Sequence, residues 1–382
     1  MTKKNYITAA LSLALAVAIM VYTGMNFLAA RDLPWPEQGP SVTDIKLLSD
    51  WFPGLKDTNG DTWVYVLQGQ KPGGKMLVLG GTHANEVSGY MSAFTFIETA
   101  VVEEGTVYVI PYTNHSAMTH NDPGEGNLQY FTLQTKSGAR TFRYGSRATN
   151  PVDQWPDPDV YVHFPSGQQL SGSETRNINR GYPGREDGNL TEKMAYGVAS
   201  LIRAENIDLT FDLHEASPEY PVINATVVHQ NAIDIGSEGC MNLLLQGIDM
   251  ALEQSPINFH GLTHRELGDH TETLAILMET ANASQGRLRG ATTLNQVLGG
   301  WDDCYVVSQK LNMLYVPWDE NGHPIEERCG RHLQGIYEYS QAFNNAHPDT
   351  PIVYSGVPSY AELFTNADPA TLGGAHLGSF LM

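Results

Sequence analysis

Short apolar segments that alternate with longer helical ones constrain the fold of this chain more than any other feature. Segment 75–80 (KMLVLG) is a mostly apolar run that ends in glycine, which is typical of a buried strand. Segment 85–100 follows it and has the length and pattern of a helix. The same reasoning predicts strands at 62–68, 75–80, 106–110, 207–213, 222–228 and 274–278, and helices at 85–100, 192–204, 236–253 and 333–344. This alternation predicts an α/β fold, a sheet with helices on both faces.

The N-terminus carries a different kind of apolar segment. Lys3 and Lys4 precede an apolar run at about 6–30, which is nearer to the ~20 residues of a membrane span than to a secretory signal. Its end, 27–30 (FLAA), has large residues where signal cleavage requires small ones, so an uncleaved hydrophobic helix is favoured over a cleaved signal. The flanking lysines stay in the cytoplasm, so the bulk of the chain is expected outside the cytoplasmic membrane, anchored, or else secreted or periplasmic.

Composition excludes some partners. The formal net charge is −20, from 42 acidic and 22 basic side chains, which argues against general nucleic-acid binding. Three cysteines do not make a disulfide framework. One bridge between Cys304 and Cys329 and three unpaired thiols both remain open. Since no CxxC pair is present, a thiolate zinc site has no support.

The pattern divides the chain into segments. Residues 116–175 are rich in Gly, Pro, Asp and Asn and are expected to form a surface insertion of the kind that often carries function. The predicted organisation is an anchor or signal at 1–31, a linker at 32–45, the main domain at 46–350 and a C-terminal tail at 351–382.

A histidine and a glutamate follow the glycines that end the 75–80 strand. His83 and Glu86 are three residues apart on one turn, so both side chains can face one point. Imidazole nitrogen and carboxylate oxygen are normal zinc donors. This pair alone is a weak signal, because a surface turn before a helix has the same composition.

Two further strands end in ionisable residues. His214 ends the 207–213 strand, and Glu279 ends the 274–278 strand. Open α/β sheets place their sites at the carboxyl ends of strands, so these side chains are expected beside His83. We predict a metal site of His83, Glu86 and His214 with one open position, which is the catalytic pattern. Glu279 would then be the general base that takes a proton from the attacking water.

A polar pair lies between these motifs. Asn179 and Arg180 precede a turn (GYPG), and an arginine fork can pair bidentately with a carboxylate. A solvated loop has the same composition. Together, Gly-Gly-x-His-x-Asn-Glu, Asn-Arg, Asp-Leu-His and a late Glu resemble the zinc carboxypeptidases, most of all the succinylglutamate desuccinylase and aspartoacylase branch. The motifs extend over about 75–285.

This resemblance implies a three-layer mixed sheet and one Zn2+ held by the three predicted ligands. It implies that Glu279 is the catalytic glutamate and that Asn179 and Arg180 bind a substrate carboxylate. A separate arginine polarises the scissile carbonyl in the family, and Arg147 is the first match, with Arg143 second. Both stand farther upstream of the Asn-Arg pair than in the desuccinylases.

The chain also departs from that branch. Ala84 stands where the branch has Gly, and Asn177-Ile178 replaces Asp-Leu. Residues 120–173 read as an enlarged insertion. A second polar cluster precedes the Glu279 strand, and it could be a second metal site, a pocket wall or a solvated loop. It comprises His260, His264, Glu266, Asp269 and His270.

The resulting hypothesis is a hydrolase of an amide bond next to a carboxylate, either a carboxypeptidase or a deacylase of N-acyl amino acids. Its partners would be a small molecule or peptide with a carboxylate and, through the N-terminal helix, a membrane. No Gly-x-Ser-x-Gly elbow and no phosphate-binding glycine loop is present. A non-catalytic binding protein on the same fold is the alternative.

Overall fold

A mixed sheet forms the centre of the molecule. The computed structural model describes residues 2–122 and 126–382. Within them a nine-stranded sheet has the order β1-β2-β4-β3-β9-β12-β10-β11, with β13 paired to β4. Pairs β3–β4, β3–β9, β9–β12 and β10–β11 are parallel, and the other pairs are antiparallel. The strands are β1 (Val42–Leu47), β2 (Trp63–Gln68), β3 (Lys71–Leu79), β4 (Val101–Ile110), β9 (Leu209–Ala216), β10 (Ala225–Val228), β11 (Ala251–Gln254), β12 (Leu274–Ala281) and β13 (Val353–Ser355).

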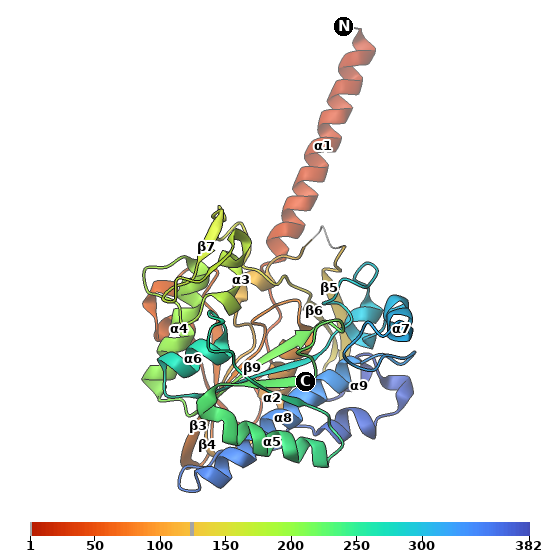
Figure 1. Ribbon diagram of the computed structural model, residues 1–382. Coiled ribbons are helices and arrows are strands. Elements are labelled where there is room, and N and C mark those ends of the chain that lie inside the picture. Colours follow the sequence, from red (N-terminus) through yellow and green to blue (C-terminus); the bar gives the residue numbers. More distant parts are fainter. Residues whose placement is uncertain (1, 123–125) are drawn as a thin grey trace.

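Helices cover both faces of this sheet (Figure 1). One face carries α2, α5 and α8, and the other carries α4 and α6. The helices are α1 (Lys3–Ala29), α2 (Val87–Thr99), α3 (His115–Met118), α4 (Leu190–Glu205), α5 (Ile233–Leu245), α6 (Thr263–His270), α7 (Asp303–Lys310), α8 (Ile325–Ala346) and α9 (Ala375–Gly378). The predicted three-layer α/β fold class with a mixed sheet is confirmed.

The two-sided burial of β3 shows why its sequence is apolar throughout. Met76 and Val78 pack in the core on the α2 and α8 side, while Leu77 and Leu79 pack in the core on the α4 side. All four are fully buried. Successive side chains of a strand point to opposite faces, so a strand between two helical layers needs apolar residues at every position. Each buried side chain of this size contributes about 1.5–3 kcal/mol.

Helix α4 shows how local sequence sets an element's ends. Asn189 caps its N-terminus by accepting from the Glu192 amide, and the Glu192 carboxylate accepts in return from the Asn189 amide. The helix ends at Asn206, which adopts the left-handed conformation that asparagine tolerates.

One predicted element is wrong in extent. Segment 236–253 was expected to be a single helix, but α5 ends at Leu245 and β11 begins at Ala251. Gly247, with a φ of 77°, turns the chain after the helix. The turn lets β11 pair in parallel with β10 as the edge strand of the sheet. Its sequence, ALEQ, is short and partly polar and does not predict a strand.

The insertion at 116–175 holds more regular structure than its composition indicates. Strands β5 (Tyr130–Thr135) and β6 (Gly138–Arg143) form one hairpin, and β7 (Val160–Val162) and β8 (Gln169–Ser171) form another. These short strands pair only within their own hairpins and not with the central sheet. Hydrophobic periodicity gives little signal for strands of this kind. Residues 123–125 of the insertion lie outside the described residues.

The linker after α1 and the C-terminal segment pack against the domain, whereas α1 itself does not. Helix α1 projects from it (Figure 1) and is long and apolar enough to cross a membrane. The linker after it is docked, since the Tyr112 hydroxyl donates to Pro34 O (2.7 Å) and Arg31 pairs with Asp153 (3.1 Å). Residues 351–382, expected as a tail, supply β13 and the fully buried Leu381. All three cysteines are free thiols, so the Cys304–Cys329 bridge does not form.

Candidate metal centre and substrate cavity

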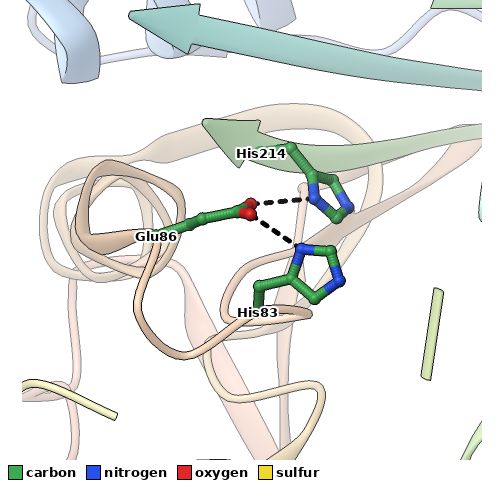
Figure 2. Close-up of side chains that lie close together, drawn as sticks. All are labelled: His83, Glu86 and His214. Atoms are coloured by element: carbon green, nitrogen blue, oxygen red, sulfur yellow. Dashed lines mark hydrogen bonds and ion pairs between the residues drawn. The ribbon is translucent and has the colours of Figure 1, made fainter. Parts of the chain in front are cut away.

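Two imidazoles from separate elements converge on one carboxylate. Glu86 is the N-cap residue of α2, His83 lies in the turn before it, and His214 lies in β9 near its carboxyl end. Glu86 Oε1 is 2.8 Å from His83 Nδ1, and Glu86 Oε2 is 2.9 Å from His214 Nδ1 (Figure 2). Their potential ligand atoms all lie within 4.8 Å of one another, and all three residues are buried. This group could hold a metal ion.

The outer nitrogens of both imidazoles are already bonded. His83 Nε2 is 2.9 Å from Asn177 Oδ1, and His214 Nε2 is 2.7 Å from Asp212 Oδ2. The amide oxygen and the carboxylate are acceptors, so each Nε2 carries the hydrogen. In a neutral imidazole of this tautomer, Nδ1 has the free lone pair that a metal ligand requires. A metal ion would therefore replace the proton that His214 Nδ1 otherwise donates to Glu86. The chemistry of this donor set therefore fits a divalent ion such as zinc.

Asp212 is itself held in place. Its Oδ1 accepts from the Thr82 hydroxyl at 2.6 Å, and its Oδ2 accepts from the Thr263 hydroxyl at 2.6 Å. Burial alone would raise the pKa of Asp212, but His214 and these hydroxyls outweigh it and lower the pKa. The carboxylate thus stays ionised and keeps His214 oriented.

The charges of the ligand group depend on one another. Burial would raise the pKa of Glu86, but His83 and His214 hold it well below its usual range. Burial lowers the pKa of His83 to about 4, with Arg147 acting in the same direction. His214 has its pKa raised by Asp212 and Glu86 despite burial. The carboxylates of Glu86 and Asp212 thus hold a proton on His214, and a metal ion bound by the group would displace that proton.

Glu279 lies next to this group. In the parallel ladder of β9 and β12, Glu279 is the register partner of His214. Burial raises the pKa of Glu279 to about 8, and Glu86 and Asp212 add to the effect against His214 and Arg147. Its Oε2 is buried without a hydrogen-bond partner among the described residues. A carboxyl group with a raised pKa and an open oxygen is suited to proton transfer.

A cavity of about 280 Å3 is lined by five of the predicted site residues, and His83 is the one predicted metal ligand among them. Arg147 lies at its wall with Nη1 3.3 Å from both Glu86 Oε1 and His83 Nδ1, and its side chain is 44% exposed. Asn179 Oδ1 accepts from Thr263 N (2.9 Å), which leaves its amide NH2 for a ligand. The full lining is His83, Arg147, Asn179, Arg180, Glu215, Ala216, Ser217, Tyr220, Phe259, Leu262, Glu279 and Gln285.

Arg180 is constrained within this cavity. Its guanidinium lies 4.9 Å from the Phe259 ring centroid, and Nη1 donates to Asn179 O at 2.6 Å. The carboxylate of Glu174 is 3.9 Å from its Nε, a loose pair. Burial, reinforced by Arg147, lowers the pKa of Arg180. Two arginines line this cavity, which makes it suitable for an anionic group.

Arg143 is not part of this cavity. Its Nε donates to Met118 O (2.9 Å), and it lies in a separate cavity beside the end of α1. Strand β6 places Arg143 before the bend that carries Arg147 to the ligand group. Of the two arginines, the structure therefore brings only Arg147 to the predicted site.

The second polar cluster forms ion pairs of its own. Glu266 is 2.8 Å from His260 Nδ1 and 3.1 Å from His270 Nε2, while His264 Nδ1 bonds to the Ser255 hydroxyl at 2.7 Å. Asp269 pairs with Arg265. Among the described residues, the His83, Glu86 and His214 group is the one that brings ligand atoms close enough for a metal, and the second cluster is not such a group.

Sequence reasoning missed several residues of the site. Asp212 was visible two positions before His214, where the period of a strand puts both on one face. Asn177 was noted only as a departure from the motif of the desuccinylase branch, and its contact with His83, 94 residues away, was not predicted. Glu215 was also missed; it faces the other side of β9 and forms a buried ion pair with Arg328 of α8.

Comparisons with known proteins find distant structural similarity and no sequence match. No family model matches the chain, and a search of curated proteins finds no match. Among solved structures, a succinylglutamate desuccinylase/aspartoacylase from Rhodobacter sphaeroides is 16% identical, with 57% of this chain and 51% of that chain covered and a TM-score of 0.34. A metallo-carboxypeptidase from Burkholderia cenocepacia is 12% identical, with 85% and 68% covered and a TM-score of 0.45.

A third similar structure is the product-bound ectoine utilization protein EutE (DoeB) from Ruegeria pomeroyi, 16% identical, with 59% of this chain and 55% of that chain covered and a TM-score of 0.38. The chain thus spans little more than half of the first matched structures. Such distant similarity carries no argument about what this chain binds or cleaves.

Proposed function

We propose that this protein is a zinc-dependent hydrolase that cleaves an amide bond next to a carboxylate, in a domain outside the cytoplasmic membrane. The observation that carries the proposal is one cavity that His83, Glu279, Asn179 and Arg180 all line. It joins a candidate metal centre, a candidate base and a candidate carboxylate site.

Each group of residues at the site has a separate role in the proposed reaction. Asn179 and Arg180 bind the substrate carboxylate and fix the distance to the scissile bond. Zinc held by His83, Glu86 and His214 would supply Lewis acidity and lower the pKa of water. Glu279 accepts the proton of the attacking water at its carboxylate and later donates it to the leaving nitrogen.

Arg147 is assigned to the developing oxyanion. Its guanidinium is near the ligand group, and its 44% exposed side chain has room to reorient when a substrate enters. A donor aimed at the charge that forms in the transition state stabilises it more than the ground state. Arg147 is assigned to the oxyanion because it lies beside Glu86. Arg180 is assigned to the substrate carboxylate because it lies beside Asn179.

Two substrate classes are consistent with this arrangement. A location outside the membrane favours peptides, including those of cell walls, whereas the resemblance to the desuccinylase branch favours N-acyl amino acids. Tyr220 and Phe259 line the same cavity and add aromatic surface beside Arg180, which suits either class.

A substrate panel tests the proposal directly. Full-length protein in detergent is offered peptides with free or amidated C-termini and N-acyl amino acids, before and after treatment with a zinc chelator. Expected is hydrolysis that requires the free carboxylate, stops on chelation and returns with one equivalent of Zn2+. Binding of these ligands without turnover at full zinc occupancy would instead establish a non-catalytic binding protein.

The location has its own test. A reporter fused to the C-terminus of the full chain should be accessible to protease added outside intact cells. The N-terminus of the chain should be protected from that protease. The opposite accessibility would overturn the proposed topology, and release of the domain into the medium would show that the N-terminal segment is cleaved.

A further inference from the structure

A second cavity lies where α1 meets the domain. It has a volume of about 410 Å3, and its walls include Thr23, Asn26, Phe27 and Ala30 from the helix end and His120 and Arg143 from the insertion. We call it the α1-foot cavity. None of its lining residues is acidic, although the whole chain carries a formal net charge of −20. Its composition therefore suits an anion with an apolar part.

Arg143 is the cationic group of this cavity. The residue is 2% exposed, and its guanidinium lies 4.9 Å from the Tyr130 ring centroid. Its Nε donates to Met118 O, but Nη1 is buried and has no hydrogen-bond partner among the described residues. A buried guanidinium without a carboxylate is costly, and an anionic ligand would remove that cost.

His120 also lines this cavity. Its Nδ1 is buried and has no partner within the described part of the chain. Two unpartnered nitrogens in one cavity indicate a ligand more strongly than either alone, because buried polar atoms are nearly always hydrogen-bonded.

The depth of the cavity along α1 points to the source of the ligand. The helix has 27 residues, about 40 Å at 1.5 Å per residue, against about 30 Å for a bilayer's hydrocarbon core. A core centred on α1 therefore ends near Asn26, with Thr23 about one turn inside it and Ala30 at headgroup level. The docking of residues 31–36 onto the domain holds the cavity at that level.

We propose that the α1-foot cavity binds the phosphate of a membrane phospholipid, with Arg143 as the principal ligand and an acyl chain along α1. This site goes beyond the hydrolase reaction and rests on α1 spanning a bilayer. Bound lipid would fix the domain at the membrane surface with its hydrolytic cavity in a constant orientation.

Native mass spectrometry of the full chain in mild detergent tests the proposal. The probes are phosphatidylglycerol, a diacylglycerol with the same acyl chains, and inorganic phosphate. Expected is one phosphatidylglycerol per chain, bound at least tenfold more tightly than the diacylglycerol and not displaced by millimolar phosphate. Competition by inorganic phosphate at the same site would show a free anion as the ligand and overturn the lipid assignment.

Three variants locate the site. Arg143→Gln should weaken phosphatidylglycerol binding about tenfold or more, whereas Arg203→Gln, on an exposed part of α4, should not. Asn26→Asp places a carboxylate in the cavity from the exposed helix and leaves the domain core untouched, so it decides the matter if Arg143→Gln does not fold. Equal binding by Asn26→Asp and the parent chain would reject the site.

Discussion

Glu279 and His214 are register partners in the parallel ladder of β12 and β9, so the candidate base and a candidate metal ligand point to the same face of the sheet. The backbone hydrogen bonds of two central strands fix their separation. Neither side chain depends on a loop for its position, and rigid elements hold a site more precisely than loops do.

Removal of the Glu279 carboxylate tests its assignment as the base. Glu279→Gln keeps the size of the side chain but cannot accept the proton, so kcat should fall by about 10²–10⁴-fold. Zinc content, measured by elemental analysis, should not change. Glu272→Gln, an exposed site just before the same strand, is the matched control and should retain full activity. Undiminished turnover in Glu279→Gln would reject the role.

Asp212 should control metal affinity without contacting the metal. Three groups donate to its carboxylate, and Asp212→Asn replaces one acceptor oxygen with a donor. Loss of such a partner weakens metal binding by about 10–100-fold. Competition with a chromophoric chelator measures the change, and activity should return at saturating zinc.

Asp234→Asn, on the exposed start of α5, controls for the loss of one negative charge. Unchanged zinc affinity in Asp212→Asn would show that His214 is oriented by other contacts.

Arg180 should distinguish substrates by their carboxylate. Arg180→Gln removes a charge-assisted pair of about 1.5–3 kcal/mol, so KM for a substrate with a free carboxylate should rise by about 10–100-fold. A substrate with an amidated end should be affected little, which means that the variant removes the preference of the parent enzyme. Arg180→Lys keeps the charge but not the fork and should lie between the two. An equal loss on both substrates would contradict the assignment.

Glu327 of α8 should make stability depend on pH. Its carboxylate lies 2.9 Å from His323 Nδ1 and 3.0 Å from Arg331 Nη2. Burial alone would raise the pKa of Glu327, but His323 and Arg331 outweigh it and lower the pKa. The stabilisation is therefore complete above the unfolded pKa of about 4.3 and is lost as pH falls through the lower folded pKa.

Glu327→Gln should thus reduce the free energy of unfolding by on the order of 2 kcal/mol at pH 7 and progressively less toward pH 3. Urea unfolding at several pH values measures this difference. A difference that stays constant with pH would show that the ionised carboxylate is not what stabilises α8.

The sequence by itself determined the central strands and the ordered motifs. Segment 75–80 is apolar at every buried position because both faces of β3 are covered, and that pattern is local. His83 and Glu86 are close in sequence, so a single turn brings them together. His214 and Glu279 were predictable because parallel strands present their carboxyl ends at one edge of the sheet.

Only the tertiary structure decided which polar residues join these motifs. Arg143 and Arg147 are the same residue type and only four positions apart, so the sequence does not distinguish them. The bend after β6 brings Arg147 to Glu86 and leaves Arg143 beside α1. Asn177 meets His83 across 94 residues, and no local pattern records such a contact. Periodicity reports which face of an element is buried, whereas the partner of a side chain depends on how distant elements pack.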